Sequence, residues 1–425
     1  MKSQEKIVVQ GGRSLSGELT IGGSKNDALA ILVATILVPG VTILHNAPAN
    51  SDVLNLLEIF QEIGVRSRFL SASTLEIDAS QLSGSETPHH HVRQMRASFN
   101  LLGALLSRFG HAEVAMPGGC NIGARPVNFH IRGLEQLGAK LRLEHGVYYG
   151  QVGRFLGANI NLEFPSAGAT QHLMIAACCA MGRTVIENCA AEPEVVNLAN
   201  FLNACGARIH GAGTTTVTID GVVGLHPTEF SILPDRMQVG TYAIASAITG
   251  GDVFVRGALY DHCRPLFSKL LDAGVQLEED AAGVRVRRSA SNICATDFMT
   301  MPHPGFPTDM QPIMGTLLAL SDGVSVITET IYENRFRYTM ELAKMGADIR
   351  VSGRNAIITG VKRLSGAPVV CPDLRGGAAL VIAGLAADGE TQISDLHHID
   401  RGYEGMVDNL RGLGAIIGRS AVVVG

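Results

Sequence analysis

A pattern of amphipathic helix, glycine and strand recurs six times along this chain. The glycines that end the six helical stretches are separated by 74, 68, 68, 72 and 68 residues. They are Gly64, Gly138, Gly206, Gly274, Gly346 and Gly414. A glycine after the last helical turn is a common helix C-cap, and a near-constant spacing marks a repeated supersecondary unit. The sequence therefore predicts six copies of one unit.

A second pattern lies between these copies. Apolar runs rich in small residues, such as ALAILVATIL and LMIAACCAMG, are each followed by a β-branched, alternating stretch. A helix that is apolar on nearly all sides must be buried on all sides, and alternating strands suit sheets with one wet face. Because 425 residues are too many for one core, we expect an α/β fold of two globular domains, each with three units. In both domains the helices lie inside and the sheets outside.

Composition excludes several classes of protein. The net charge is −5, whereas a nucleic-acid binder would show a strongly basic face. The chain lacks a signal-peptide core and an apolar run of the roughly 18 residues that a membrane span needs. None of the eight cysteines forms a CxxC pair or a His/Cys cluster with zinc spacing. We expect a cytoplasmic protein without a metal, a cofactor, a nucleic-acid partner or a membrane partner.

One cysteine lies on a glycine-rich loop, MPGGCNIGARP, at residues 116–126. Cys120 follows Gly118 and Gly119, and Arg125 comes five residues later. Glycines allow close backbone approach to a ligand, and a nearby arginine favours a thiolate. A small buried hydrophobe and a reactive thiol are equally good interpretations of this loop taken alone.

Charged residues precede several of the all-apolar helices. Lys25 follows a glycine pair in GGSKNDALA, and Asp309 and Asp373 stand before later helices. Each could simply be a solvated lysine or a helix cap. However, cations also stand at corresponding places in other units, and a cleft that gathered them would hold an anion with phosphate and carboxylate groups. These cations are Lys25, Arg96, Arg125, Arg335, Arg375 and Arg401.

The chain resembles the enolpyruvyl transferase family, and most closely its members that act on UDP-N-acetylglucosamine. The resemblance spans essentially the whole chain, and the cysteine loop is its most specific part. It rests on the motifs GGSKNDALAI, MRAS, PGGCNIGARPVNFHI, PSAGAT, EPEVVNLANFL, LPDRMQVGTY, HPGFPTDMQ, ENRF, PDLRGGAAL and HIDRGYE, which occur in the family's order.

The resemblance implies a two-domain inside-out α/β barrel with six βαβαββ pseudo-repeats. One domain would span 25–233, and the other would combine 1–24 with 234–425. The active site would lie between them, and the domains would close on the sugar nucleotide. The implied reaction transfers the enolpyruvyl group of phosphoenolpyruvate to the 3'-hydroxyl of UDP-N-acetylglucosamine and releases phosphate, as the first committed step of peptidoglycan synthesis.

The resemblance also implies catalytic roles. Lys25 and Arg125 would hold the phosphate of phosphoenolpyruvate, and Arg401 its carboxylate. Asp309 would contact the sugar near the attacking hydroxyl and act as base. Cys120 would be the general acid toward the vinyl carbon, and its thiol would capture the epoxide antibiotic fosfomycin.

Other residues would bind or support the substrates. Asn26 would contact the sugar. Arg335, Asp373 and Arg375 would support the site electrostatically. The remaining substrate contacts, most of them to the nucleotide, would be Arg96, Arg125, Pro126, Val127, Ser166, Ala167, Gly168 and Ile331.

Four residues depart from the family's usual pattern. Asn128 and Gln238 stand where acidic residues are common, Phe164 where some members have lysine, and Asp27 where alanine is frequent. They leave open a paralogue that uses another uridine nucleotide in secondary metabolism. A catalytically silent paralogue that binds sugar nucleotide is a third hypothesis, which the intact Cys120, Asp309, Lys25 and Arg401 disfavour. The sequence does not predict an oligomeric state.

Overall fold

The structure, a computed structural model, describes residues 4–87, 95–118, 127–288 and 292–422. These residues form two compact units, each with its own hydrophobic core. Unit 1 contains the described residues of 1–22 and 234–425, and unit 2 those of 23–118 and 127–233.

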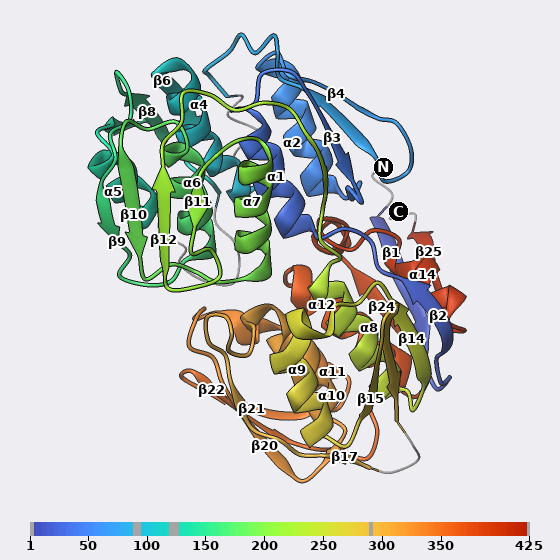
Figure 1. The fold of residues 1–425 in the computed structure, drawn as a ribbon. Helices are drawn as coiled ribbons and strands as arrows, with labels where there is room; N and C mark the ends of the chain where they lie inside the picture. The colour runs from blue at the N-terminus through green and yellow to red at the C-terminus, as the bar shows by residue number, and fades with distance from the viewer. Residues whose placement is uncertain (1–3, 88–94, 119–126, 289–291, 423–425) are drawn as a thin grey trace. The chain divides into compact units, whose positions relative to one another are not determined.

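Three buried helices form the centre of each unit (Figure 1). Unit 2 contains α1 (Lys25–Thr35), α4 (Leu101–Phe109) and α6 (Ala167–Ala177). Unit 1 contains α8 (Arg236–Ile248), α10 (Gln311–Leu318) and α12 (Leu374–Ala386). In α8 every residue after Arg236 is buried, as the apolar runs of the sequence predict.

Sheets cover the buried helices of unit 2. The first sheet has the order β13 (Glu229–Ser231), β3 (Val41–His45), β5 (Leu75–Asp78), β4 (Arg66–Phe69). The second has the order β6 (His111–Ala115), β8 (Val147–Gln151), β7 (Lys140–Glu144). The third has the order β11 (Ile209–His210), β12 (Thr216–Asp220), β10 (Arg183–Glu187), β9 (Asn159–Asn161).

The sheets of unit 1 follow the same plan. The first is β15 (Gln276–Asp280), β16 (Gly283–Arg287), β14 (Asp252–Arg256), β2 (Ser16–Thr20). The second is β18 (Phe298–Met299), β20 (Val324–Thr328), β22 (Asn355–Thr359), β21 (Asp348–Ser352), beside a short pair of β17 (Ile293–Cys294) and β19 (Ser321–Asp322). The third is β23 (Pro368–Val370), β24 (Glu390–Ser394), β1 (Gln4–Gln10), β25 (Ile416–Val422).

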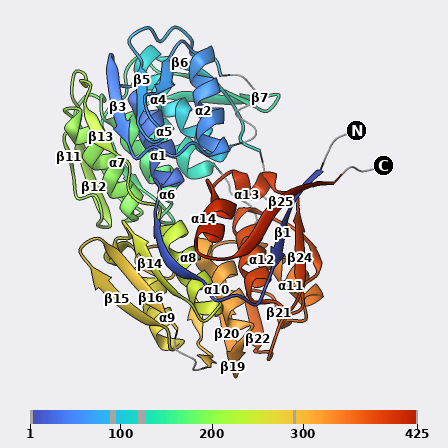
Figure 2. The ribbon, with the colours of Figure 1, turned by 90° about the vertical axis from the view of Figure 1, so that its right-hand side faces the viewer.

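The chain closes the third sheet of unit 1 with strands from its two ends. β1 pairs antiparallel with β24, where Ile7 lies opposite Ile393, and with β25, where Ile7 lies opposite Arg419. Figure 2 shows β1 in blue between these two red strands. The first strand of the chain is therefore an interior strand of the last sheet.

Amphipathic helices connect the strands within the repeats, and a glycine follows each one. The helices are α2 (Ser51–Glu62), α5 (Asn128–Gln136), α7 (Pro193–Ala204), α9 (Tyr260–Asp272), α11 (Tyr338–Lys344) and α14 (Met406–Gly412). Each is followed by a C-cap residue and then by one of the six predicted glycines, whose φ angles are 90°, 100°, 98°, 85°, 93° and 97°. Positive φ at the residue after the cap is the conformation that favours glycine. The predicted six-repeat fold with inner helices and outer sheets is confirmed.

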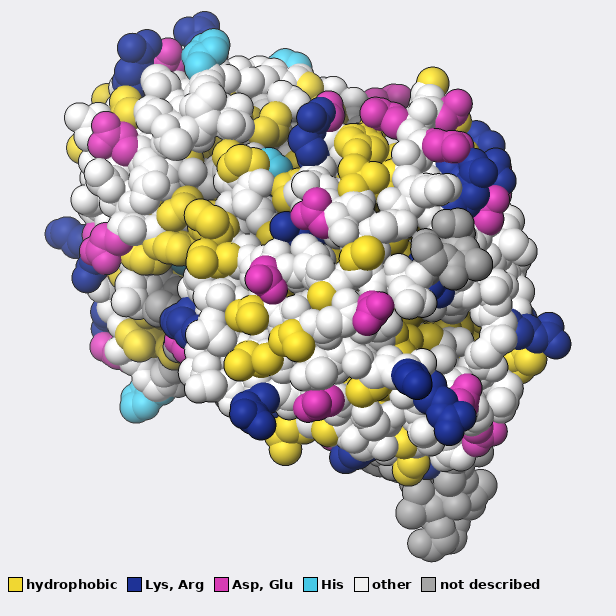
Figure 3. Space-filling model, turned by 90° about the horizontal axis from the view of Figure 1, so that it is seen from below, with side chains coloured by type: hydrophobic (Ala, Val, Ile, Leu, Met, Phe, Trp, Pro, Cys, Tyr) yellow, Lys and Arg dark blue, Asp and Glu magenta, His cyan; other side chains and the backbone are white. Residues whose placement is uncertain are grey.

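The remaining helices of the described residues are short: the 3-10 turns η1 (Arg96–Asn100), η2 (Thr308–Met310) and η3 (Arg335–Arg337), and α13 (His397–Asp400). Among the described residues, none of the helices combines the length and apolar character that crossing a bilayer requires. The face seen in Figure 3 carries positive and negative side chains interspersed, in keeping with the net charge of −5.

Candidate active site

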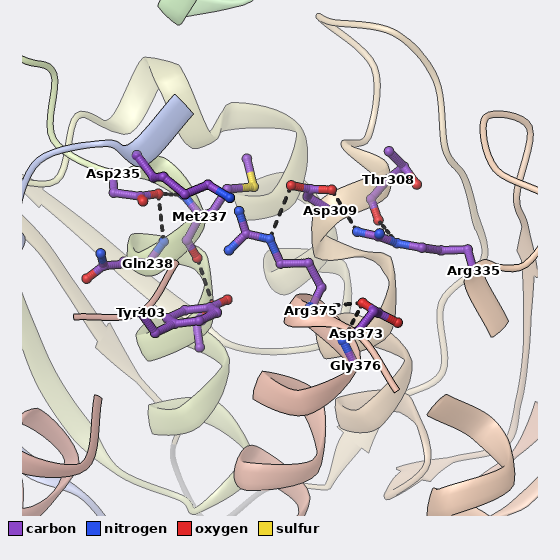
Figure 4. A network of polar contacts seen from close by, with 12 residues as sticks. Asp235, Met237, Gln238, Thr308, Asp309, Arg335, Asp373, Arg375, Gly376 and Tyr403 are labelled. Carbon is purple, nitrogen blue, oxygen red and sulfur yellow. Dashed lines mark hydrogen bonds and ion pairs between the residues drawn. The ribbon is translucent and has the colours of Figure 1, made fainter. Parts of the chain in front are cut away.

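The Asp309 carboxylate in unit 1 is held between two arginines (Figure 4). Arg335 Nη2 lies 2.7 Å from Oδ1, and Arg375 Nε lies 3.1 Å from Oδ2. The arginine side chains are 2% and 3% exposed, whereas the Asp309 side chain is 31% exposed. Two buried cations therefore stand behind one accessible carboxylate.

Local backbone structure positions both arginines. Arg335 begins η3, and its Nε donates to the carbonyl oxygen of Thr308 at 3.1 Å. Arg375 lies in the first turn of α12, which Asp373 caps by accepting from the backbone N–H of Arg375 and of Gly376 at 3.0 and 3.1 Å. The predicted cluster of Asp309, Arg335, Asp373 and Arg375 thus comes together because three helices begin at this place.

Arg375 remains charged although it is buried. Burial opposes the charged guanidinium, but the Tyr403 ring system and the nearby carboxylates of Asp309 and Asp235 outweigh it and raise the pKa of Arg375. The guanidinium carbon lies 5.3 Å from the centre of the Tyr403 ring, and the Tyr403 hydroxyl is 2.8 Å from that of Thr241. Tyr403 and Asp235 were not predicted as site residues.

Glu329 is a third residue that was not predicted for the site. It is 1% exposed, and its carboxylate accepts hydrogen bonds from the hydroxyls of Thr300 and Thr308 at 2.8 and 3.0 Å. It also accepts from the backbone N–H of Ile331 at 2.8 Å and of Tyr332 at 3.1 Å. Glu329 therefore fixes the predicted contact Ile331 relative to the turn that carries Asp309.

Lys25 and Asn26 begin α1 in unit 2. Lys25 Nζ lies 3.2 Å from Asp52 Oδ2, and the Lys25 side chain is 12% exposed. Asn26 is exposed. The turn before them requires a glycine, because a Cβ on Gly23 would lie 1.8 Å from the carbonyl oxygen of Asn46. A lysine at a helix N-terminus is a suitable site for a phosphate group.

Most of the predicted nucleotide contacts that the structure describes also lie at helix starts of unit 2. Ser166 caps α6 by accepting from the Ala169 N–H at 3.3 Å, so that Ala167 and Gly168 form the first turn. Val127 is the residue before α5, and Arg96 begins η1.

A buried pair of histidines, His130 and His172, lies next to the first turn of α6. His172 Nε2 accepts from the backbone N–H of Gly103 at 2.8 Å, and the Nδ1 atoms of His172 and His130 lie 2.9 Å apart. Burial lowers the pKa of His172 to about 3, so the ring is neutral. Because its Nε2 accepts, its Nδ1 donates to His130, which fixes the tautomers of both rings. A Cβ on Gly168 would lie 3.4 Å from the His130 ring.

Comparison with known proteins shows to which family this chain belongs. The family model of EPSP synthase (3-phosphoshikimate 1-carboxyvinyltransferase) matches residues 9–410. UDP-N-acetylglucosamine 1-carboxyvinyltransferase 3 of Caldanaerobacter subterraneus subsp. tengcongensis is 49% identical over 97% of this chain and 99% of that protein. UDP-N-acetylglucosamine 1-carboxyvinyltransferase 2 of Carboxydothermus hydrogenoformans is 46% identical over 98% and 99%.

The chain belongs to the UDP-N-acetylglucosamine 1-carboxyvinyltransferase family. Among solved structures it is similar to the enolpyruvyl transferase NikO from Streptomyces tendae, with a TM-score of 0.91 and 25% identity over 99% of this chain and 100% of that one. It shares the fold of EPSP synthase from Acinetobacter baumannii, with a TM-score of 0.76 and 18% identity over 98% and 100%. The predicted resemblance is confirmed.

Three residues that depart from the usual pattern of the UDP-N-acetylglucosamine 1-carboxyvinyltransferase family lie in different surroundings. Asn128 is the exposed first residue of α5. Phe164 is 39% exposed. Gln238 is 4% exposed in α8, where its backbone N–H donates to Asp235 at 3.2 Å.

Three residues predicted from the family lie outside the described residues: Cys120, Arg125 and Pro126. Arg401, the residue predicted to bind the carboxylate, follows α13 in unit 1 and is half-buried. Within the described ranges, no group of three or more His, Cys, Asp or Glu side chains could hold a metal ion.

A cavity of about 350 Å³ in unit 1 contains none of the predicted residues. It lies where the buried helices end, next to Ile248 of α8 and Ala386 of α12, and four of its lining side chains are basic. Arg288 donates there to the carbonyl oxygens of Ala247 and Ile248, at 2.5 and 3.5 Å. This cation therefore caps a helix C-terminus, which stabilises the helix.

Proposed function

We propose that this chain transfers the enolpyruvyl group of phosphoenolpyruvate to the 3'-hydroxyl of UDP-N-acetylglucosamine and releases phosphate, as the first committed step of peptidoglycan synthesis. The observation that carries the proposal is the 46–49% identity to proteins of that name over at least 97% of this chain. Both substrates are small anionic molecules, and no cofactor is required.

The reaction proceeds by addition and elimination. In the addition step the 3'-oxygen bonds to C2 of phosphoenolpyruvate, the 3'-hydroxyl proton leaves to a base, and C3 gains a proton from an acid. In the elimination step C3 loses a proton, the double bond forms again, and the C2–phosphate bond breaks. Positioned acids and bases typically contribute about 10²–10⁴-fold each.

In this proposal Asp309 is the base and Cys120 the acid. The exposed part of Asp309 supports its role, because the carboxylate is accessible while the two arginines that orient it are buried. Each carboxylate oxygen has a second lone pair that can accept the hydroxyl proton. Arg335 and Arg375, with Asp373 capping the turn, would stabilise the charge that develops in the transition state.

The anionic groups would be held by cations. Lys25 and Arg125 would bind the phosphate, and Arg401 the carboxylate of phosphoenolpyruvate. The position of Lys25 at the start of α1 supports its role, because the helix N-terminus adds a favourable field for phosphate. Asn26 would contact the sugar, and the remaining contacts would come from Arg96, Pro126, Val127, Ser166, Ala167, Gly168 and Ile331.

The test measures phosphate release from phosphoenolpyruvate with a panel of uridine nucleotides. We expect release with UDP-N-acetylglucosamine and a fall in kcat of about 10²–10⁴-fold for Asp309→Asn, which keeps the shape but removes the base. Asp388→Asn is the matched control, because Asp388 is an exposed carboxylate that pairs with Arg363 at 3.3 Å in the same unit. Release only with another nucleotide would contradict the acceptor, and an unchanged Asp309→Asn rate would contradict the base.

A further inference from the structure

The side chain of Asp27 is completely buried in the first turn of α1, two residues after Lys25. Its Oδ2 accepts from Asn197 Nδ2 at 2.7 Å and from the backbone N–H of Leu233 at 2.8 Å. Its Oδ1 is buried without a hydrogen-bond partner among the described residues. The carboxylate therefore ties α1 to α7 and to Leu233, and leaves half of its own hydrogen-bonding capacity unused.

Leu233 is the last residue of unit 2 before the chain passes to unit 1. Its carbonyl oxygen accepts from the Ser24 N–H at 2.7 Å, so Ser24 and Asp27 together hold both backbone groups of Leu233. The next hydrogen bond along the chain joins the N–H of Asp235 to the carbonyl oxygen of Gly22 at 3.0 Å. The two chain passages at residues 22–23 and 233–234 thus lie next to each other in the hydrogen-bond pattern of the described residues, and Asp27 anchors them at the unit 2 end.

This arrangement lowers the stability of the folded state when the carboxyl is ionised. A buried carboxylate with an unsatisfied oxygen opposes folding unless it is neutralised. Burial raises the pKa of Asp27 to about 7, although the bonds from Leu233 and Asn197 lower it and the charge of Glu194 raises it further. Among the described residues, the charged group that acts on Asp27 is Glu194 on α7, whereas Lys25 on the same helix as Asp27 is paired with Asp52 on α2.

We propose that Asp27 is a positioning residue for phosphate capture. It fastens the turn that carries Lys25 and Asn26 to Leu233, and its negative charge weakens the hold of that turn on the phosphate of the substrate. The identity of that substrate, phosphoenolpyruvate, rests on the proposed function.

Two physical effects follow from the proposal. Without the carboxylate oxygen, the N–H of Leu233 and the amide of Asn197 lose their acceptor, and the Lys25 turn loses its attachment. With the carboxylate ionised, a negative charge in the first helical turn opposes the positive helix end that favours phosphate. Protonation of Asp27 removes the charge but keeps an oxygen that can accept.

The kinetic test compares Asp27→Ala with Asp27→Asn over the pH range in which the carboxyl titrates. We expect Asp27→Ala to raise KM for phosphoenolpyruvate about tenfold with kcat changed much less, because substrate binding is lost rather than chemistry. Asp27→Asn keeps an acceptor oxygen and should retain a wild-type or lower KM. Across neutral pH, the ratio of the wild-type KM to the Asp27→Asn KM should rise by about three- to tenfold as the wild-type carboxylate ionises.

Thr35→Val is the matched control. Thr35 is a buried polar residue at the other end of α1, and its hydroxyl donates only within the helix, to Leu32 at 2.6 Å. This variant should leave KM for phosphoenolpyruvate and its pH dependence unchanged.

A second measurement does not depend on activity. Hydrogen exchange of the peptide that contains Leu233, followed by mass spectrometry in the full chain, should show faster exchange in Asp27→Ala and near-wild-type exchange in Asp27→Asn. Absence of phosphate release from the wild type would refute the proposed function. It would not refute the attachment of the Lys25 turn, which hydrogen exchange tests separately. The inference is overturned if Asp27→Ala keeps both the wild-type KM and the wild-type exchange. It is also overturned if Asp27→Asn raises KM as much as Asp27→Ala at every pH, because an acceptor oxygen at position 27 would then not be what holds the turn.

Discussion

Both oxygens of Asp309 contact an arginine, yet almost a third of its side chain reaches solvent. The same pair of guanidinium groups orients the carboxylate. Since Arg335 and Arg375 are buried, water cannot replace Asp309 around them, and removing the carboxylate would take away the ion-pair partner that both arginines share. Asp309 therefore has a structural role in unit 1 as well as its proposed role as the base.

Replacing Cys120 by serine tests the proposed acid. Serine is a much weaker acid than cysteine, so we expect turnover to fall by about 10²-fold or more and inactivation by fosfomycin to disappear. Phosphate release with and without preincubation with the antibiotic measures both effects. A variant with unchanged turnover and unchanged inactivation would show that another group is the acid.

The stability of the protein should depend on pH through Asp27. Its folded-state pKa is raised to about 7, above the unfolded value of 3.8, so the group stabilises the fold when protonated and loses that contribution as the pH rises through 7. The stability of Asp27→Asn relative to the wild type should therefore increase between about pH 5 and about pH 8, by about 2–3 kcal/mol. Urea unfolding at both pH values measures this difference, and a difference that does not change with pH would contradict it.

At this scale the sequence predicted some residues of the candidate site and missed others for a definite reason. Asp309, Arg335 and Arg375 were predicted because charged residues before buried helices collect where helices begin. Glu329 directly follows β20, and its neighbours in the sequence do not mark a site. Its role comes from hydrogen-bond donors on Thr300, Thr308 and the 331–332 backbone. Such a convergence of separate segments leaves no local signal in the sequence.

At the scale of elements, the glycine that follows each amphipathic helix can be tested with a pair of variants in one turn. Gly414 has φ 97° and open space at its Cβ position, so Gly414→Ala should destabilise by about 1–2 kcal/mol through backbone strain alone. Gly412 also has open space but lies within α14, so Gly412→Ala should stabilise by about 0.5–1 kcal/mol. Chemical unfolding measures the change in the free energy of unfolding for both variants. Equal effects would show that the backbone conformation at Gly414 is unimportant.

The elements were predictable because they repeat. Apolar runs predict the inner helices, and turn glycines at near-constant spacing predict the ends of the amphipathic helices. The strands that complete the sheets from a distance were not predictable, since β13 joins β3 across most of unit 2 and β1 joins β24 and β25 across most of the chain. Pairing at such a separation depends on where the three units of a domain close, which no local pattern records.

At the scale of the whole molecule, two separate cores predict two separable losses of stability. Leu173 in α6 and Leu317 in α10 are both completely buried, one in each core. Each leucine-to-alanine change should cost about 2–5 kcal/mol, but Leu173→Ala should weaken unit 2 and Leu317→Ala unit 1. Hydrogen exchange followed by mass spectrometry reports the two units separately. Equal loss of protection in both units from either variant would show that they unfold together.

The place of β1 gives the protein an order of assembly on the ribosome. Residues 23–233 contain every strand of the unit 2 sheets, so this unit can fold as soon as its last strand, β13, leaves the exit tunnel. β1 is translated first, but its neighbours β24 and β25 come last, and until then its edges have no partner. The amino-terminal strand must wait for the carboxyl-terminal one, so ribosomes that stall late would release chains with a finished unit 2 and an unfinished unit 1.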